Sequence, residues 1–457
     1  MRKLFSTIAF ALAVLTAVQA SAQTPRDRRP YRGLFGSGVS ETEQLLSVSF
    51  SAGGGYDDDV LLGEGGGAQP SGNPVASTLG QASVGLGYSL NRARGGFSAT
   101  AGLSMSHYPA LDESTVIYRS GSIGGSYQFS DRTSVSGSLL AMYQPLHFMS
   151  YVPVLSNPLD PAIVTEDSVI PEVVLREPVP GMPNSTDPVL AYQISNYLDM
   201  SGGAGLGQAL TRRMSASVNY SFRQAESPIG ESFLSQTYGG GIQYRIGRGL
   251  GARAGYNMNE ARFKSEITVS TTRIHQGDFG LDFNHGISLT RRTTLAVRTG
   301  TSALVDEVRT HFLFTANVQL THELGRTWSL VGGYNRDISF LETFSHPVLA
   351  DSLNAGVGGL ITRRLQFQAN TGASKGSVGL SGVDNGFNNY FAGAGLTYGL
   401  MRNLGLSVNY SFYRYSYGVG VDLPGGIPAH SDRQSIRAGV NFWAPLFSRA
   451  RRTNASR

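Results

Sequence analysis

The feature that most constrains the fold is a period-two alternation of apolar and polar residues that recurs from Glu43 to Leu446. In the segment MSASVNYSF, residues 214–222, apolar residues take every second position and Ser or Asn takes the others. The segment LGLSVNYSF, residues 404–412, repeats the pattern. Successive side chains of a strand point to opposite faces, so each such segment predicts a two-faced β-strand. We count about 18 segments, and 16 stays open because sequence-based boundaries err by roughly two to four residues.

The connections between these segments alternate in length. Eight are short enough for hairpin turns, and three of them carry the tripeptide Thr-Arg-Arg, within residues 210–214, 289–293 and 361–365. Long connections lie between them, and the longest, residues 146–187, is acidic and rich in Pro. Proline cannot donate to a β-ladder, so this stretch is expected to be a loop.

The N-terminus is typical of a cleaved secretory signal peptide over residues 1–22. Arg2 and Lys3 precede an apolar run, and Ala20-Ser21-Ala22 fits a cleavage site. A short N-terminal anchor is the alternative. A short basic segment (23–42) would then precede the β-domain (43–446), and a basic tail (447–457) would follow it.

The composition argues against a catalytic, metal-binding or cofactor-binding function. The chain has no Cys, which excludes disulfides and thiolate metal sites, and its eight His show no metal-ligand spacing. The glycine run at 202–207 lacks the strand-turn-helix context of a dinucleotide site. We therefore expect no catalytic residue, no metal, no cofactor and no nucleic-acid partner.

In strand length, even strand number, short-long alternation and its last strand, SIRAGVNFW (435–443), the chain resembles bacterial outer-membrane β-barrels of the porin type. The resemblance implies a transmembrane antiparallel up-and-down barrel, with short periplasmic turns, long external loops and strands that are apolar outside and polar inside. It also implies periplasmic termini and contact with outer-membrane lipid, lipopolysaccharide and the barrel assembly machinery. The oligomeric state stays open.

A soluble β-sandwich also alternates, with its apolar face turned inward. Two observations favour the membrane barrel. The segments exceed the usual strand length of about 5–6 residues. The short turns are net basic and the long connections net acidic, a sorting that a membrane with two different surfaces explains.

Aromatic and basic residues are expected to mark the membrane boundaries. Four tyrosines precede short turns by a few residues and predict a periplasmic aromatic girdle: Tyr88, Tyr127, Tyr244 and Tyr398. Tyr143, Phe222 and Phe412 are candidates for the outer girdle. The turn arginines are expected to extend toward inner-leaflet phosphates: Arg212, Arg213, Arg291, Arg292, Arg363 and Arg364.

Alternation also predicts the residues that line the lumen. The charged ones are Arg223, Arg245, Arg253, Arg298, Arg437, Asp278, Asp282 and Asp337. They either neutralise one another or set up a field that filters solutes. If the long loop folds inward, its acids are constriction residues: Asp160, Glu166, Asp167, Glu172, Glu177 and Asp187. An outward-projecting loop is the alternative.

Two local predictions concern the end of the chain. Tyr413, Tyr415 and Tyr417 lie on the nominal inner face, where they could stack on sugars, but we favour a bulge after Phe412 that turns them outward. Pro445 is expected to end strand pairing.

An 18-stranded barrel is wide enough to leave an aqueous channel. The sequence therefore predicts a porin-like channel for passive passage of small hydrophilic solutes, not an enzyme. A conduit for polysaccharide export and a structural or adhesive barrel are the alternatives.

Overall fold

The fold is seen in a computed structural model, which describes residues 42–59, 76–92, 94–110, 114–145, 196–226, 232–247, 249–264, 269–286, 292–305, 310–325, 327–339, 347–379, 385–421, 423 and 429–450. The chain separates into two units, Met1–Arg32 and Gly33–Arg457, and every described residue belongs to the second. The predicted signal peptide, the loop 146–187 with its acids, and residues 451–457 lie outside the described residues. Across the described part of the chain, no helix is long and apolar enough to cross a membrane.

The described residues form one sheet of 18 strands, and each strand has 12 to 21 residues. The first nine strands are β1 (Thr42–Asp57), β2 (Ser77–Arg92), β3 (Gly95–Tyr108), β4 (Ser114–Ser130), β5 (Thr133–Pro145), β6 (Asn196–Ala209), β7 (Met214–Glu226), β8 (Ser232–Gly247) and β9 (Leu250–Lys264). The other nine are β10 (Val269–Gly286), β11 (Thr293–Val305), β12 (Thr310–Leu324), β13 (Trp328–Ser339), β14 (Val348–Leu360), β15 (Leu365–Val378), β16 (Gly386–Gly399), β17 (Leu404–Tyr417) and β18 (His430–Ala450).

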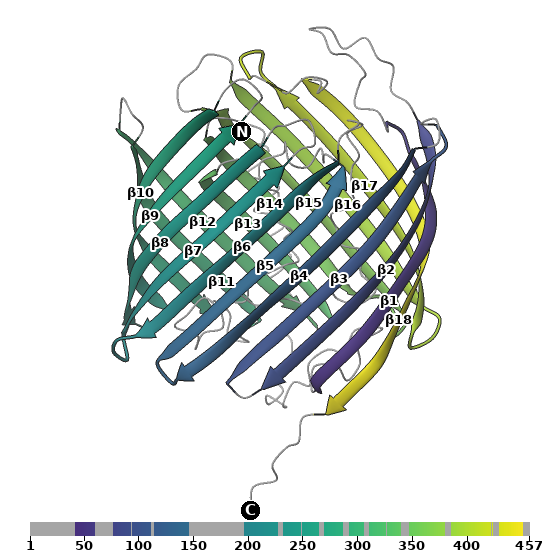
Figure 1. The fold of residues 1–457 in the computed structure, drawn as a ribbon, viewed down its shortest axis with the longest axis horizontal. Coiled ribbons are helices and arrows are strands. Elements are labelled where there is room, and N and C mark those ends of the chain that lie inside the picture. Colours follow the sequence, from purple (N-terminus) through teal and green to yellow (C-terminus); the bar gives the residue numbers. More distant parts are fainter. Residues whose placement is uncertain are drawn as a thin grey trace, which may run out of the picture. The chain divides into compact units, whose positions relative to one another are not determined.

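Every strand pairs antiparallel with the next one in the chain, and β18 pairs with β1, so the sheet closes into a barrel of tilted strands (Figure 1). Closure gives every strand a partner on both sides, so no strand is an open edge of the sheet, as a hydrocarbon environment requires. Eight strands roughly fill their own interior, whereas 16 to 18 leave an aqueous lumen. The fold is a closed antiparallel up-and-down β-barrel, and the predicted strand number of 18 is confirmed.

The apolar face of each strand points outward. Phe50 of β1 is level with Val84 of β2 and Phe442 of β18, and these three side chains are 48%, 43% and 40% exposed. Phe279 of β10, on the opposite side of the barrel, also faces outward and is 66% exposed. Side chains that are apolar yet exposed around a closed barrel form a surface suited to lipid.

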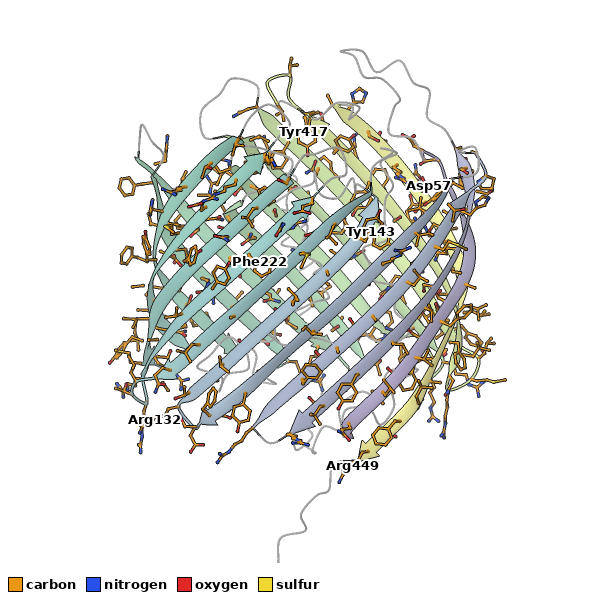
Figure 2. The ribbon with its side chains drawn as sticks, viewed as in Figure 1. Asp57, Arg132, Tyr143, Phe222, Tyr417 and Arg449 are labelled. Carbon is orange, nitrogen blue, oxygen red and sulfur yellow. The ribbon has the colours of Figure 1, made fainter. Side chains whose placement is uncertain are left out.

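Turns and long connections lie at opposite ends of the barrel. Figure 2 shows Arg132 and Arg449 at the end with the short turns, and Asp57 and Tyr417 at the other end. The barrel begins and ends at the short-turn end, where Thr42 pairs with Ala450.

The last strand differs from the prediction. Pro445 was expected to end pairing, but β18 continues to Ala450 and Pro445 lies opposite Ser47 of β1. Pairing of β18 with β17 ends at Phe442, so the other edge of β18 is unpaired at Pro445. A register shift in β1 between Leu46 and Ser47 lies at the same level. Proline is tolerated at such an edge because its missing N–H has no ladder partner to lose.

Candidate functional site

The inner wall of the barrel consists mainly of hydroxyl, amide and glycine positions. Neighbouring strands join through these groups, as in the contacts of Ser51 with Ser83 and of Thr100 with Ser122, each 2.6 Å between the Oγ atoms. Asn317 Nδ2 donates to Asn335 Oδ1 at 3.2 Å. These side chains are uncharged and hydrogen-bonding, so the wall offers polar contacts to water and to neutral solutes.

The eight predicted pore-lining residues all occupy inward-facing positions, and four of them are in contact. Arg253 of β9 forms ion pairs with Asp278 and Asp282 of β10, the second at 3.1 Å. Arg298 of β11 reaches Asp282 at 3.0 Å. The sequence left two interpretations open for the lumen charges, namely mutual neutralisation or a field that filters solutes. Mutual neutralisation describes these four residues, and their ion pairs link adjacent strands of the wall.

Two further ion pairs lie near the long-loop end of the lumen, and their acidic members were not predicted from the sequence. Arg223 donates to both carboxylate oxygens of Asp199, at 3.3 and 2.8 Å, and Asp199 is 3% exposed. Arg433 donates to both oxygens of Asp57, at 2.8 and 2.5 Å, with side-chain exposures of 4% and 0%. Asp57 could have been predicted to face the lumen, because it occupies one of the alternating positions that point inward. It is, however, the first of three consecutive acids, Asp57-Asp58-Asp59, and such a run is typical of a loop.

Arg437, Arg245 and Asp337 complete the predicted set. Arg437 points inward but is buried against the wall, 6% exposed. Arg245 and Asp337 are exposed, and neither has an ion-pair partner within 4.0 Å among the described residues. Arg298 is also exposed but is ion-paired with Asp282, so Arg245 and Asp337 are the exposed charged groups of this set without such a partner among the described residues.

The preferred prediction for the tyrosines of β17 is wrong. Its pairings with β16 and β18 run without a register shift, so no bulge follows Phe412. Tyr413, Tyr415 and Tyr417 therefore face inward. Tyr415 and Tyr417 are only 2% and 5% exposed because they pack with each other and, through Tyr417, on Phe387. Ring faces packed in this way are not available to stack on a sugar.

The tyrosines proposed for the periplasmic girdle lie on the outward face, close to the short-turn ends of β2, β4, β8 and β16. Tyr127, Tyr244 and Tyr398 are 48%, 45% and 42% exposed. Tyr88 packs on Phe97 of β3, with ring centroids 6.1 Å apart. Tyr143 and Phe222, two candidates for the outer girdle, also lie on outward-facing strand positions (Figure 2).

The structure explains why Thr recurs in the Thr-Arg-Arg turns. In the 210–214 turn, Thr211 Oγ1 accepts hydrogen bonds from the backbone N–H groups of Arg213 and Met214, at 3.2 and 3.0 Å. In the 361–365 turn, Thr362 does the same for Arg364 and Leu365, at 3.3 and 3.1 Å. The third copy lies largely outside the described residues. Threonine thus satisfies two donors that the tight turn leaves without a ladder partner.

The arginine that ends several of the short turns has a backbone role. Its carbonyl accepts an N–H from the next descending strand, as Arg213 does from Arg245 at 2.7 Å and Arg364 from Gly399 at 2.7 Å. Five arginines hold this position: Arg94, Arg132, Arg213, Arg292 and Arg364. The last three were predicted from the sequence to lie in periplasmic turns, whereas the equivalence of Arg94 and Arg132 was not predicted.

Removing both turn hydroxyls, as in T211A/T362A, is expected to destabilise the barrel by about 0.5–1 kcal/mol per turn, since water replaces part of each lost hydrogen bond. Urea unfolding in detergent measures this. The matched control T211S/T362S keeps both acceptors and is expected to unfold like the wild type. Equal stability of the Ala and Ser variants would show that the hydroxyls do not hold the turns.

Comparisons with known proteins add similarity of fold at low identity. No protein-family model matches the chain, and no curated protein matches it in sequence. Among solved structures, Pseudomonas aeruginosa OpdQ is 12% identical, covering 89% of this chain and 100% of its own, with a TM-score of 0.42. Pseudomonas aeruginosa OccK2 (OpdF), solved in complex with glucuronate, is 11% identical over 89% and 99%, with a TM-score of 0.42. The siderophore receptor PirA of Acinetobacter baumannii is 8% identical over 88% and 81%, with a TM-score of 0.41. At these values no function is carried over from those proteins.

Proposed function

We propose that this chain forms an outer-membrane channel through which small hydrophilic solutes diffuse passively. One observation carries the proposal: several polar side chains point into the lumen and yet are exposed. They lie on β8, β11, β12 and β13 and are Gln243, Arg245, Arg298, Asn317 and Asp337. A filled interior would bury them, so this arc of the wall borders open space that water can occupy.

We also propose an orientation. The short-turn end, which carries the arginines described above, faces the periplasm, and so do both termini. At the other end, outward-facing cations lie at the level of the external leaflet. Arg262 and Arg273 both pair with Glu260 at 2.8 Å, which leaves an excess positive charge there. This supports contact with lipopolysaccharide phosphates. Insertion by the barrel assembly machinery is expected from the resemblance alone.

Solute passage is tested by swelling of liposomes that contain the refolded protein. We expect rapid swelling in pentoses and hexoses, with rates that fall steadily as the sugar grows, because a wall of neutral hydrogen-bonding groups discriminates mainly by size. Swelling no faster than in protein-free liposomes would contradict the channel. A polysaccharide conduit predicts instead that a long glycan blocks the uptake of small sugars.

Reversing the exposed lumen charges is expected to change ion selectivity. The interaction of a permeant ion with a charge about 7 Å away in water is about 0.6 kcal/mol, roughly threefold in local concentration. R245E should therefore favour cations by about two- to threefold, and D337R should favour anions by a similar factor, both effects weakening at high salt. Reversal potentials across a salt gradient measure this. R262E, on the outward face, is the matched control and should leave selectivity unchanged; a shift equal to that of R245E would count against the lumen assignment.

A further inference from the structure

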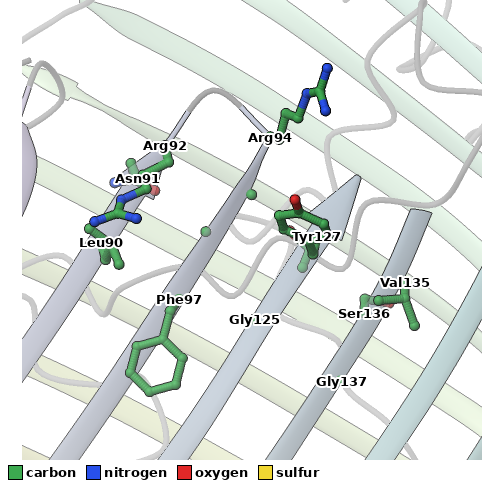
Figure 3. A pocket seen from close by; sticks show the side chains of 13 residues that line it. Leu90, Asn91, Arg92, Arg94, Phe97, Gly125, Tyr127, Val135, Ser136 and Gly137 are labelled. Atoms are coloured by element: carbon green, nitrogen blue, oxygen red, sulfur yellow. The ribbon is translucent and has the colours of Figure 1, made fainter. Parts of the chain in front are cut away.

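A groove of about 1070 Å³ runs over the outward face of β2–β5 at the short-turn end (Figure 3). Its outward-facing lining is apolar and includes Leu90, Phe97, Tyr127 and Val135. The groove exists because glycines stand where neighbouring strands carry side chains. Gly125 of β4 lies opposite Gly137 of β5. Phe97 of β3 lies opposite Gly125 on its other side, so its ring bounds this row of glycines.

A second hollow of about 340 Å³ lies on the same face, farther from the short turns. Its floor is the next row of small residues, Ala101, Gly121 and Ala141, which are in register across β3, β4 and β5. The ridge between the two floors is formed by Ile123 and Leu139, which are also paired. Two troughs therefore lie side by side across the same three strands, both open toward the membrane.

The larger groove ends at two cations. Arg92, the last residue of β2, and Arg94, in the turn to β3, both line it, and both side chains are exposed. A guanidinium is a strong partner for a phosphate because its donors form a planar fork. An apolar groove that ends at two guanidinium groups, with a second apolar hollow beside it, matches the phosphate and the acyl chains of a phospholipid.

We propose that this face binds one glycerophospholipid of the inner leaflet. Its phosphate is held by Arg92 and Arg94, and its acyl chains lie in the troughs floored by Gly125 and Gly137 and by Gly121. The proposal rests on the membrane location given above but not on conduction, so it is tested in detergent solution, where no pore activity is needed.

The test is titration of the folded protein with phosphatidylglycerol, followed by native mass spectrometry. G137L fills the trough, and a Cβ at residue 137 meets only the Gly203 carbonyl, at 3.5 Å, so the barrel accommodates it. R92A/R94A removes the phosphate partners and leaves the trough intact. We expect a 1:1 lipid complex whose Kd rises by about tenfold or more in either variant.

Matched controls separate the groove from the rest of the surface. Gly240 is also outward-facing, and its Cβ would likewise lie 3.5 Å from one carbonyl, that of Ser217, so G240L adds the same bulk elsewhere. R363A/R364A removes two turn arginines that do not line the groove, and it therefore tests whether general attraction between turn arginines and phosphates is enough to hold the lipid in detergent solution. Both controls should bind phosphatidylglycerol like the wild type, and diacylglycerol, which lacks the phosphate, should bind the wild type weakly.

Three results would overturn the proposal. Equal phosphatidylglycerol affinity in G137L and G240L would show that the groove is not the site. Diacylglycerol that binds as tightly as phosphatidylglycerol would exclude recognition of the phosphate. Oligomers of the wild type that G137L dissociates and lipid does not would show that a second copy of the chain fills the groove. None of these results would bear on liposome swelling, so failure of the lipid site and failure of the channel are distinguishable.

Discussion

Replacing Asp57 with asparagine is expected to lower the free energy of unfolding of the barrel by about 3–5 kcal/mol, because the substitution leaves the Arg433 guanidinium buried without its counter-charge. Arg433 is 4% exposed and donates to both oxygens of Asp57. The pair joins β1 to β18, the junction that closes the barrel. Denaturant unfolding in detergent micelles, followed by circular dichroism, measures the loss.

The chain offers a matched control close by. Arg414 and Asp432 also pair across adjacent strands near the same end, at 3.3 Å, but their side chains are 61% and 58% exposed. An exposed pair contributes about 0–1 kcal/mol, so D432N should be nearly neutral. The double variant D57L/R433M, which replaces the buried pair with apolar groups, should recover much of the loss. Equal destabilisation by D57N and D432N would contradict the role given to burial.

Deleting residues 146–187 is expected to raise the conductance, on the order of twofold or more if the barrel keeps its width. The lumen differs along its length. Several inward-facing residues near the long-loop end are buried, including Tyr108, Asp199, Val348 and Phe387, although Asp337 on β13 is exposed there; Arg245 near the short turns is also exposed. The restriction to flow should therefore lie toward the long-loop end, where the longest and most acidic connection begins and ends.

The loop deletion needs a control for general damage to that end. Deleting residues 60–75, the connection between β1 and β2, removes chain from the same end without the Pro-rich acidic stretch. We expect this second deletion to change conductance little. If the 146–187 deletion leaves conductance unchanged, the outward-projecting loop is the better description. A less acidic version, in which Asp160, Glu166 and Asp167 are replaced by the corresponding amides, should reduce cation preference only if the loop borders the pore.

The fold followed from the sequence because alternation is a local signal. Each residue's parity sets its face, and the register between strands runs with few shifts, so an alternating segment such as 404–412 keeps its two faces along its length. Closure also followed, since an even strand number brings the first and last strands to the same end. The same parity placed Arg253, Asp278 and Arg298 inside, although it could not show which of them touch.

The errors share one physical cause, namely that strand ends depend on neighbours as well as on the local sequence. Asp57 and Asp199 were not assigned to the lumen because acids beside a loop look solvated, yet each meets an arginine from another strand. Pro445 was predicted to end strand pairing. The edge of β18 that faces β17 has no ladder partner at this level, so a proline there loses no backbone hydrogen bond. The packing of Tyr415 and Tyr417 likewise depends on the neighbouring strand β16, whose contacts with β17 parity alone does not reveal.

The lipid-facing groove could not be predicted from alternation either. Gly125 and Gly137 are 12 positions apart in the sequence, and only the register of β4 on β5 brings them opposite each other. Parity shows that both face outward. A cavity appears only when the rows of neighbouring strands are aligned.

The most direct test of the central claim is the single-channel conductance of the refolded protein in a planar lipid bilayer. The open arc of the lumen, bordered by Arg245, Asn317 and Asp337, predicts discrete conductance steps that grow in proportion to salt concentration, as in a water-filled pore. Folded protein that inserts into the bilayer and shows no conductance steps at any salt concentration would contradict the channel and leave a structural barrel as the better account.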